Sequence, residues 1–187
     1  MSSDADTPGG DAARREAVLD AALHTFARYG YRKTSMEDVA REARISRPGL
    51  YFLFSSKSGL FGAAADRGVD RDLHRAQQAL DAPGRSLTER VVDAFDCWAG
   101  RYVGPLRDVT AVLDDNPDLL GPVARAGPDR FERMLTAALE DASVPEAAAV
   151  TRTLVSASIG IKHQAARREE YRARTATAVD LLTRRPA

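Results

Sequence analysis

The sequence predicts an all-α protein of about nine helices, and three observations support this fold class. Hydrophobic residues make up 44% of the 187 residues and aromatic residues only 6%, and alanine is abundant, which favours helices over sheets. Apolar residues recur along most of the chain with the three-to-four-residue spacing of amphipathic helices. No segment shows the strict alternation of apolar and polar residues that is typical of a half-buried strand.

Capping residues set the expected helix boundaries. Serine or threonine precedes several of the apolar segments, and glycine or proline follows several of them, as is typical of helix ends. Residues 1–10 are expected to be a disordered lead-in and not a secretory signal, because they lack a basic head and an apolar segment. Residues 116–128, with Gly127 followed by Pro128, are expected to be irregular. The expected helices cover residues 11–29, 35–43, 46–54, 57–80, 86–102, 106–115, 129–142, 145–167 and 169–183.

Positive charge gathers in the first third of the chain, although the whole chain has a formal net charge of zero. Between Arg28 and Leu60, seven lysines and arginines stand against three acids. Such a local excess favours binding to a polyanion. The alternative for Arg28, Arg41 and Arg44 is an ordinary solvated helix face.

Two short helices joined by a tight turn at Arg44 and Ile45 have the layout of a helix-turn-helix. In such a unit the second helix, which here opens at Ser46 and ends near Phe54, enters the major groove of DNA while the first helix braces it. Residues 30–61 also resemble the DNA-binding signature of the TetR family of bacterial transcriptional regulators. The matching segments are Gly30 to Ala40, Ile45 to Tyr51, Phe54 to Lys57, and Leu60 with Phe61.

The resemblance implies an N-terminal three-helix DNA-binding domain over residues 11–56. A C-terminal helical domain over residues 57–187 is expected to bind an effector and to dimerise. The family often has glycine in the turn where this chain has Arg44. Arg44 therefore either adopts a left-handed backbone, at a cost of about 1 kcal/mol, or changes the shape of the turn. It is also a candidate phosphate contact.

The resemblance also assigns roles to single residues. Arg47 is expected to read bases, because a guanidinium pairs with guanine O6 and N7, and Gly49 allows the backbone to approach DNA closely. Tyr51 and Lys57 are expected to contact backbone phosphates; the alternative for Tyr51 is half-buried packing. N–H groups at the start of the bracing helix are expected to meet another phosphate. The full set of expected DNA-binding residues is Thr34, Ser35, Arg44, Ser46, Arg47, Pro48, Gly49, Tyr51 and Lys57.

Two further sites are expected in the C-terminal two thirds. An effector pocket is expected where aromatic surface meets a few polar tips, with ordinary core packing as the alternative. A dimer interface is expected on the last two helices, where small residues permit close helix approach, with an intramolecular helix pair as the alternative. The pocket residues are Phe95, Trp98, Tyr102, Phe131 and Met134, and the interface residues are Leu154, Ala157, Ser158, Ile161, Ala165, Tyr171, Ala178 and Leu182.

Several classes of protein are not expected. The single cysteine, Cys97, excludes an intrachain disulfide and suits a reducing cytosol. No apolar run reaches the roughly 18 residues of a spanning helix, so a cytoplasmic protein without a membrane partner is expected. The isolated His74 and His163 predict no metal site. Because the chain shows no nucleophile–base pair and no phosphate loop, neither an enzyme nor a cofactor is expected.

The expected function is that of a homodimeric, ligand-responsive repressor that binds a near-palindromic double-stranded DNA operator and a small-molecule effector. Activation instead of repression stays open at this point. A helical enzyme or small-molecule carrier with an incidental helix-turn-helix is one alternative, and it predicts turnover or ligand binding without specific DNA binding. A helical adaptor for other proteins is another, and it predicts no salt-dependent affinity for DNA.

Overall fold

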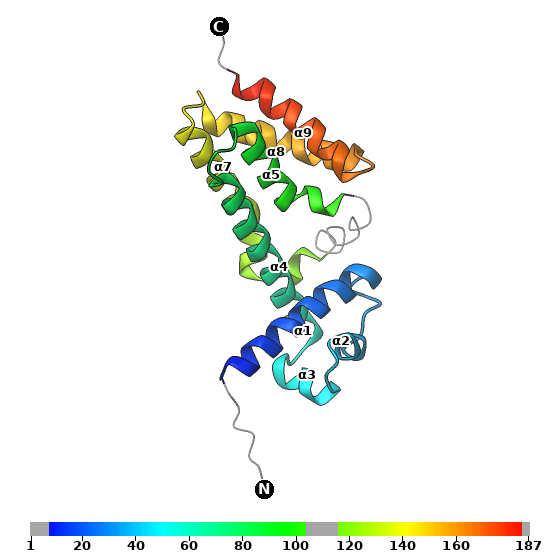
Figure 1. The fold of residues 1–187 in the computed structure, drawn as a ribbon. Helices are drawn as coiled ribbons and strands as arrows, with labels where there is room; N and C mark the ends of the chain where they lie inside the picture. The colour runs from blue at the N-terminus through cyan, green and yellow to red at the C-terminus, as the bar shows by residue number, and fades with distance from the viewer. Residues whose placement is uncertain (1–7, 104–115, 185–187) are drawn as a thin grey trace. The chain divides into compact units, whose positions relative to one another are not determined.

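The computed structural model describes residues 8–103 and 116–184, and Figure 1 shows their arrangement in helices. Within these two stretches the chain forms eight α-helices and two short 3-10 helices, with no β-strand. The all-α fold predicted from the sequence is confirmed. The helix expected at 106–115 and residues 1–7 of the lead-in expected at 1–10 lie outside the described residues. The elements are α1 (Pro8–Tyr29), α2 (Met36–Glu42), α3 (Arg47–Leu53), α4 (Lys57–Leu80), α5 (Leu87–Trp98), η1 (Gly100–Tyr102), η2 (Pro117–Leu119), α7 (Pro122–Asp141), α8 (Ala147–Gln164) and α9 (Arg168–Thr183).

Some expected boundaries are wrong. Helix α1 begins at Pro8, so residues 8–10 are helical, and α5 ends at Trp98 with a separate 3-10 turn after it. Helix α7 begins at Pro122, so Gly127 and Pro128 lie inside the helix. The reason lies in packing: a Cβ added to Gly127 would lie 2.7 Å from Cγ1 of Val69. Close approach between helices therefore requires this glycine, and the packing overrides the local break signal.

The described residues fall into two compact units. The first contains α1, α2, α3, the part of α4 up to Gly68, and residues 116–124. The second contains α4 from Val69 onward, α5, η1, the rest of α7, α8 and α9. The division falls inside α4, whereas the sequence suggests a boundary before it.

The core of the first unit is an aromatic cluster. The ring of Phe26 meets the ring of Phe61 edge to face at 5.2 Å, and Tyr31 meets Phe61 at 5.0 Å. Leu50, which is the buried residue of α3, is 0% exposed in the same cluster. Burying a leucine side chain contributes roughly 1.5–3 kcal/mol. Leu50 therefore fixes the short α3 to the rest of the unit.

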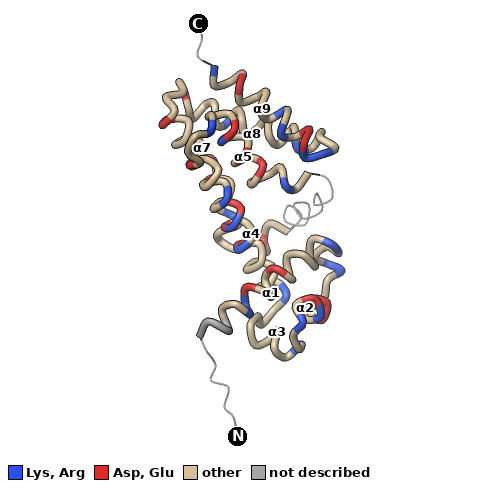
Figure 2. Tube along the Cα trace, viewed as in Figure 1, with Lys and Arg blue, Asp and Glu red and all other residues tan. Residues whose placement is uncertain are grey.

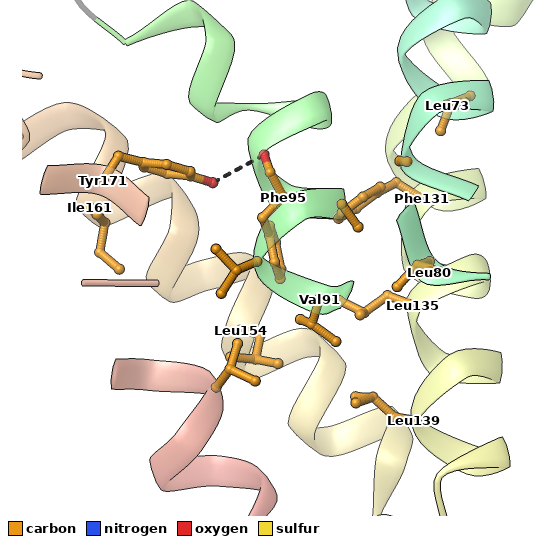
Figure 3. Packing of buried hydrophobic residues seen from close by; sticks show 14 of the residues in the cluster. Leu73, Leu80, Val91, Phe95, Phe131, Leu135, Leu139, Leu154, Ile161 and Tyr171 are labelled. Carbon is orange, nitrogen blue, oxygen red and sulfur yellow. Dashed lines mark hydrogen bonds between the residues drawn. The ribbon is translucent and has the colours of Figure 1, made fainter. Parts of the chain in front are cut away.

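The core of the second unit is built around α5. Figure 3 shows Phe95 of α5 between Tyr171 of α9 and Phe131 of α7. The ring centroids of Phe95 and Phe131 are 5.2 Å apart, and Trp98 stacks on Phe131 at the same distance. The Tyr171 hydroxyl is 2.7 Å from the Ser158 hydroxyl, and burial raises the pKa of Tyr171 to about 12. The phenol therefore stays protonated and serves the packing of α8 on α9.

A buried carboxylate joins α5 to α9. Asp96 is 5% exposed and accepts two hydrogen bonds from Arg168, at 2.8 and 2.6 Å, and one from Arg172 at 2.6 Å. Arg172 also donates to Asp93 at 2.6 Å. The hydrogen bonds to Asp96 raise the pKa of Arg168. Two cations therefore compensate a carboxylate that would be costly to bury alone.

We expect Asp96→Ala to lower the free energy of unfolding by about 2 kcal/mol, because hydrogen bonds to charged groups contribute roughly 1.5–3 kcal/mol. The measurement is urea unfolding followed by circular dichroism. Glu140→Ala is the control, because Glu140 is exposed on α7. Equal unfolding midpoints for the two variants would contradict the role given to Asp96.

Candidate DNA-binding interface

The start of α2 is closed by a capping box. Ser35 accepts a hydrogen bond from the Asp38 backbone N–H at 3.1 Å, and the Asp38 carboxylate accepts from the Ser35 N–H at 2.9 Å. The Ser35 hydroxyl also donates to the Asp38 carboxylate at 2.6 Å, and this bond, together with the one from the Ser35 N–H, lowers the pKa of Asp38. Thr34, 3% exposed, donates its hydroxyl to the Gly30 carbonyl at 2.8 Å. The structure thus places Thr34 inward, and Ser35 stands at the surface.

The turn between α2 and α3 is left-handed at Arg44, where φ is 54°. The Arg44 N–H donates to the Arg41 carbonyl and the Ile45 N–H to the Ala40 carbonyl, at 3.2 and 3.0 Å. This pair of bonds is a Schellman motif, which usually has glycine at the left-handed position. Of the two conformations open to the turn, the chain adopts the strained one and keeps an exposed arginine there.

Helix α3 begins with Ser46, whose hydroxyl accepts from the Gly49 N–H at 3.1 Å. Pro48 lies in the first turn, where a missing N–H costs little. A Cβ added to Gly49 would lie 3.3 Å from a guanidinium nitrogen of Arg14. The space above Gly49 is thus partly filled from α1.

Helix α3 exposes Arg47, Pro48, Tyr51 and Phe52 outside its buried Leu50. Arg47 lies 5.7 Å over the ring of Tyr51, and its guanidinium is 3.7 Å from the Glu37 carboxylate. Tyr51 is 42% exposed and Phe52 86% exposed. Leaving a phenylalanine in water forgoes roughly 1.5–3 kcal/mol of burial, and an exposed aromatic ring suits contact with a thymine methyl group.

Phe52 is not among the residues expected from the sequence. Its signal is positional: Leu50 and Phe54 are core residues four apart, so residue 52 points to the opposite side of a helix. Apolar residues at all of these positions hide that signal in a plain count of hydrophobicity.

Lys57 stands at the first residue of α4, beside the aromatic cluster. Its ammonium lies 4.4 Å over the ring of Tyr31 and 3.5 Å from the Arg32 carbonyl. The side chain is half-buried, so the stem is held while the charge stays near the surface. Figure 2 shows that the neighbouring α2 carries both acidic and basic residues. The acids of α2 therefore offset part of the positive charge of this unit.

The residues expected to line an effector pocket lie mostly in the core. Phe95 and Phe131 are each 1% exposed, and Tyr102 donates a hydrogen bond to Asp72, which also binds Arg101. Burial raises the pKa of both Asp72 and Tyr102. Met134 alone of the five lines a described cavity, of about 460 Å³. That cavity lies between α4 and α7 and is lined by Asp70, Leu73, His74, Gln77, Arg130, Arg133 and Met134.

The residues expected at a dimer interface face inward within the chain. Leu154, Ser158 and Tyr171 are at most 4% exposed, Ile161 and Ala165 are also buried, and Ala157, Ala178 and Leu182 are half-buried. The stripe of small residues thus accounts for the packing of α8 on α9. The outer face of these helices instead exposes Ile159 (55%) and Leu181 (65%), and a Cβ added to Gly160 would meet nothing within 4 Å.

Metal ligands, the cysteine thiol and apolar helices are the remaining features to consider in the part of the chain that the structure describes. Residues 8–103 and 116–184 contain no group of three histidine, cysteine or acidic side chains that could hold a metal ion. Cys97 is half-buried, and burial together with Asp96 and Asp72 raises the pKa of its thiol. None of the described helices is long and apolar enough to cross a membrane.

Comparison with known proteins identifies similar chains. Residues 18–64 match the family model described as bacterial regulatory proteins, tetR family. The chain is 30% identical over 108 residues to the transcriptional repressor ComR of Escherichia coli K12, covering 58% of this chain and 51% of ComR. It is 37% identical over 84 residues to the transcriptional activator FasR of Mycolicibacterium smegmatis, covering 44% and 38%. The matches span about half the length of such curated relatives or less.

Solved structures extend the similarity over nearly the whole fold. A TetR-like regulator from Rhodococcus sp. RHA1 matches with a TM-score of 0.68 and 26% identity, covering 93% of this chain and 98% of that chain. A putative TetR-family regulator from Mesorhizobium loti matches with a TM-score of 0.73 and 17% identity, covering 95% and 97%. The second match concerns the fold alone.

We expect Arg44→Gly to raise the free energy of unfolding by about 0.5–1 kcal/mol, because relief of left-handed strain exceeds the added entropy of the unfolded chain. Affinity for DNA is expected to fall if Arg44 is also a phosphate contact. Ser143→Gly is the matched control for DNA affinity. Ser143 has φ 57° and the same pair of hydrogen bonds at the end of α7, so this variant is expected to gain stability in the same way and to bind DNA unchanged. Thermal unfolding and gel shifts measure both effects; a less stable Arg44→Gly protein would contradict the account of the turn.

Proposed function

Because the chain belongs to the tetR family of bacterial regulatory proteins, we propose that it is a homodimeric, ligand-responsive transcriptional repressor that binds a near-palindromic operator. The observation that carries the proposal is the exposed face of α3, where Arg47, Tyr51 and Phe52 stand on a helix fixed from behind by Leu50. A helix with this arrangement suits insertion into a major groove. A protein-binding adaptor could also use an exposed aromatic face, but it predicts no salt-dependent affinity for DNA.

The side chains of this face divide the work of binding. Arg47 pairs with guanine in the major groove, moving away from Glu37 as DNA replaces it. Phe52 contacts a thymine methyl group. Tyr51 and Lys57 donate to phosphates on either side and set the register without reading bases.

The second unit supplies dimerisation and regulation. Ile159 and Leu181 leave apolar side chains exposed on the outer side of α8 and α9, which a second copy covers in this proposal. Two recognition helices then reach half-sites about 34–36 Å apart. The effector binds in the second unit, where the cavity of about 460 Å³ has the size of a small-ligand site. The effector binds the DNA-free conformer more tightly than the DNA-bound conformer, and this difference in affinity releases the DNA.

Activation is the second candidate function. Its support is the 37% identity to a relative described as a transcriptional activator. A reporter gene behind the selected operator separates the two candidates: expression falls with a repressor and rises with an activator when the protein is supplied.

The first experiment is selection of binding sites from random double-stranded DNA, followed by gel shifts. We expect one enriched near-palindrome with a Kd of about 10 nM or tighter. Lys57→Ala combined with Tyr51→Phe is expected to weaken binding to all sequences and to lower the slope of log affinity against log salt by about 1. Arg47→Gln is expected to relax the preference at one base position.

The control for these variants is Arg125→Gln, because Arg125 is an exposed arginine of the second unit. It removes the same charge and is expected to leave affinity and salt slope unchanged. Failure to enrich any sequence would overturn the proposed function. An unchanged salt slope in the double variant would overturn the assignment of the phosphate contacts.

The dimer is tested by placing a charge on the outer face. We expect Ile159→Arg to shift the protein from dimer to monomer in sedimentation and to weaken operator binding at least tenfold, because a buried unpaired charge disrupts an interface. Ala137→Arg, on the exposed side of α7, is the matched control. A dimer that persists in Ile159→Arg would place the interface elsewhere.

A further inference from the structure

The C-terminal end of α3 is held by a side chain from α1. Arg15 donates a hydrogen bond from Nη1 to the Leu53 carbonyl at 3.1 Å. Its guanidinium carbon also lies 4.3 Å over the ring of Phe54, the residue that ends the helix. One arginine thus holds both the last helical carbonyl and the ring that follows it.

This end of α3 lacks the usual means of closing a helix. Its cap residue, Phe54, is extended at φ −141°, so no left-handed glycine motif closes the helix. No basic residue occupies the last turn of α3 itself. The last carbonyls of a helix need partners from outside and favour a nearby cation. Arg15 supplies both from another element.

The neighbouring Arg14 lies at the opposite end of the same helix. One of its guanidinium nitrogens is 3.3 Å from the position of a Cβ at Gly49, in the first turn of α3. Two successive residues of α1 therefore reach the two ends of a helix of seven residues. The orientation of α3 is consequently set by α1 as well as by the burial of Leu50.

We infer that Arg15 is a positioning residue for DNA recognition: it fixes the angle of α3 so that the opposite face of the helix meets base edges. The inference rests on the proposed function and adds a residue to it. The Arg15 guanidinium contacts Leu53 and Phe54, and in this inference it acts through the protein and not through a phosphate. Its loss therefore affects sequence-specific binding more than general attraction to DNA.

The experiment compares Arg15→Gln with the native protein on the selected site and on random-sequence DNA of equal length. We expect about a tenfold loss of affinity for the selected site, less than about a twofold loss for random DNA, and an unchanged salt slope. Arg15→Lys is expected to recover part of the loss, because an ammonium keeps the cation over Phe54 but lacks the planar fork of a guanidinium. Arg28→Gln, an exposed arginine of the same helix, is expected to change nothing.

Hydrogen exchange of the free protein provides a readout that needs no DNA. The backbone N–H of Phe54 donates to the Leu50 carbonyl at 2.9 Å, and its exchange is expected to accelerate in Arg15→Gln while amides of the second unit keep their rates. Equal losses on both DNAs with a lower salt slope would make Arg15 a phosphate contact and overturn the inference. Unchanged exchange would overturn it as well. If the native protein enriches no site, the proposed function fails, and hydrogen exchange still decides whether Arg15 holds α3.

Discussion

A helix of seven residues cannot persist by itself in water, since isolated helices shorter than about 12–15 residues are marginal even with favourable sequences. The position of α3 therefore depends entirely on what surrounds it. Leu50 anchors its inner face in the aromatic cluster, Ser46 closes its start, and Arg15 closes its end. These contacts hold in place the helix that carries the exposed side chains.

The turn that leads into α3 is likewise held by directional hydrogen bonds. The left-handed turn at Arg44 stores strain, and the Schellman bonds around it are what hold that conformation. The second unit uses a different means. There the Asp96 carboxylate, compensated by Arg168 and Arg172, ties α5 to α9 while apolar rings fill the space between the helices. Both units combine apolar burial with a few directional bonds that select one arrangement.

Local signals were sufficient for much of the fold. The capping boxes at Ser35 and Ser86 and the stop at Gly30 depend on residues within four positions of one another, so the sequence predicts them directly. Gly127 shows the limit: its purpose is contact with Val69, a residue far away in the chain. Arg15 was beyond reach for the same reason, whereas the spacing of Leu50 and Phe54 holds a positional signal for Phe52 that a count of hydrophobic residues hides. Arg15 acts on a carbonyl 38 residues away, and Phe52 is distinguished by what does not cover it. The inward stripe on α8 and α9 shows that small residues indicate close packing without saying which chain provides the partner.

The central claim is that the outer face of α3 contacts bases in the DNA. A photo-crosslinking residue placed at position 52 tests it most directly, because Phe52 is the most exposed large apolar side chain of the described residues. In complex with the selected site, crosslinks are predicted to bases of each half-site, and the same residue at position 159 is predicted to give none. Crosslinks to DNA that are absent at position 52, although the complex forms, would contradict the account.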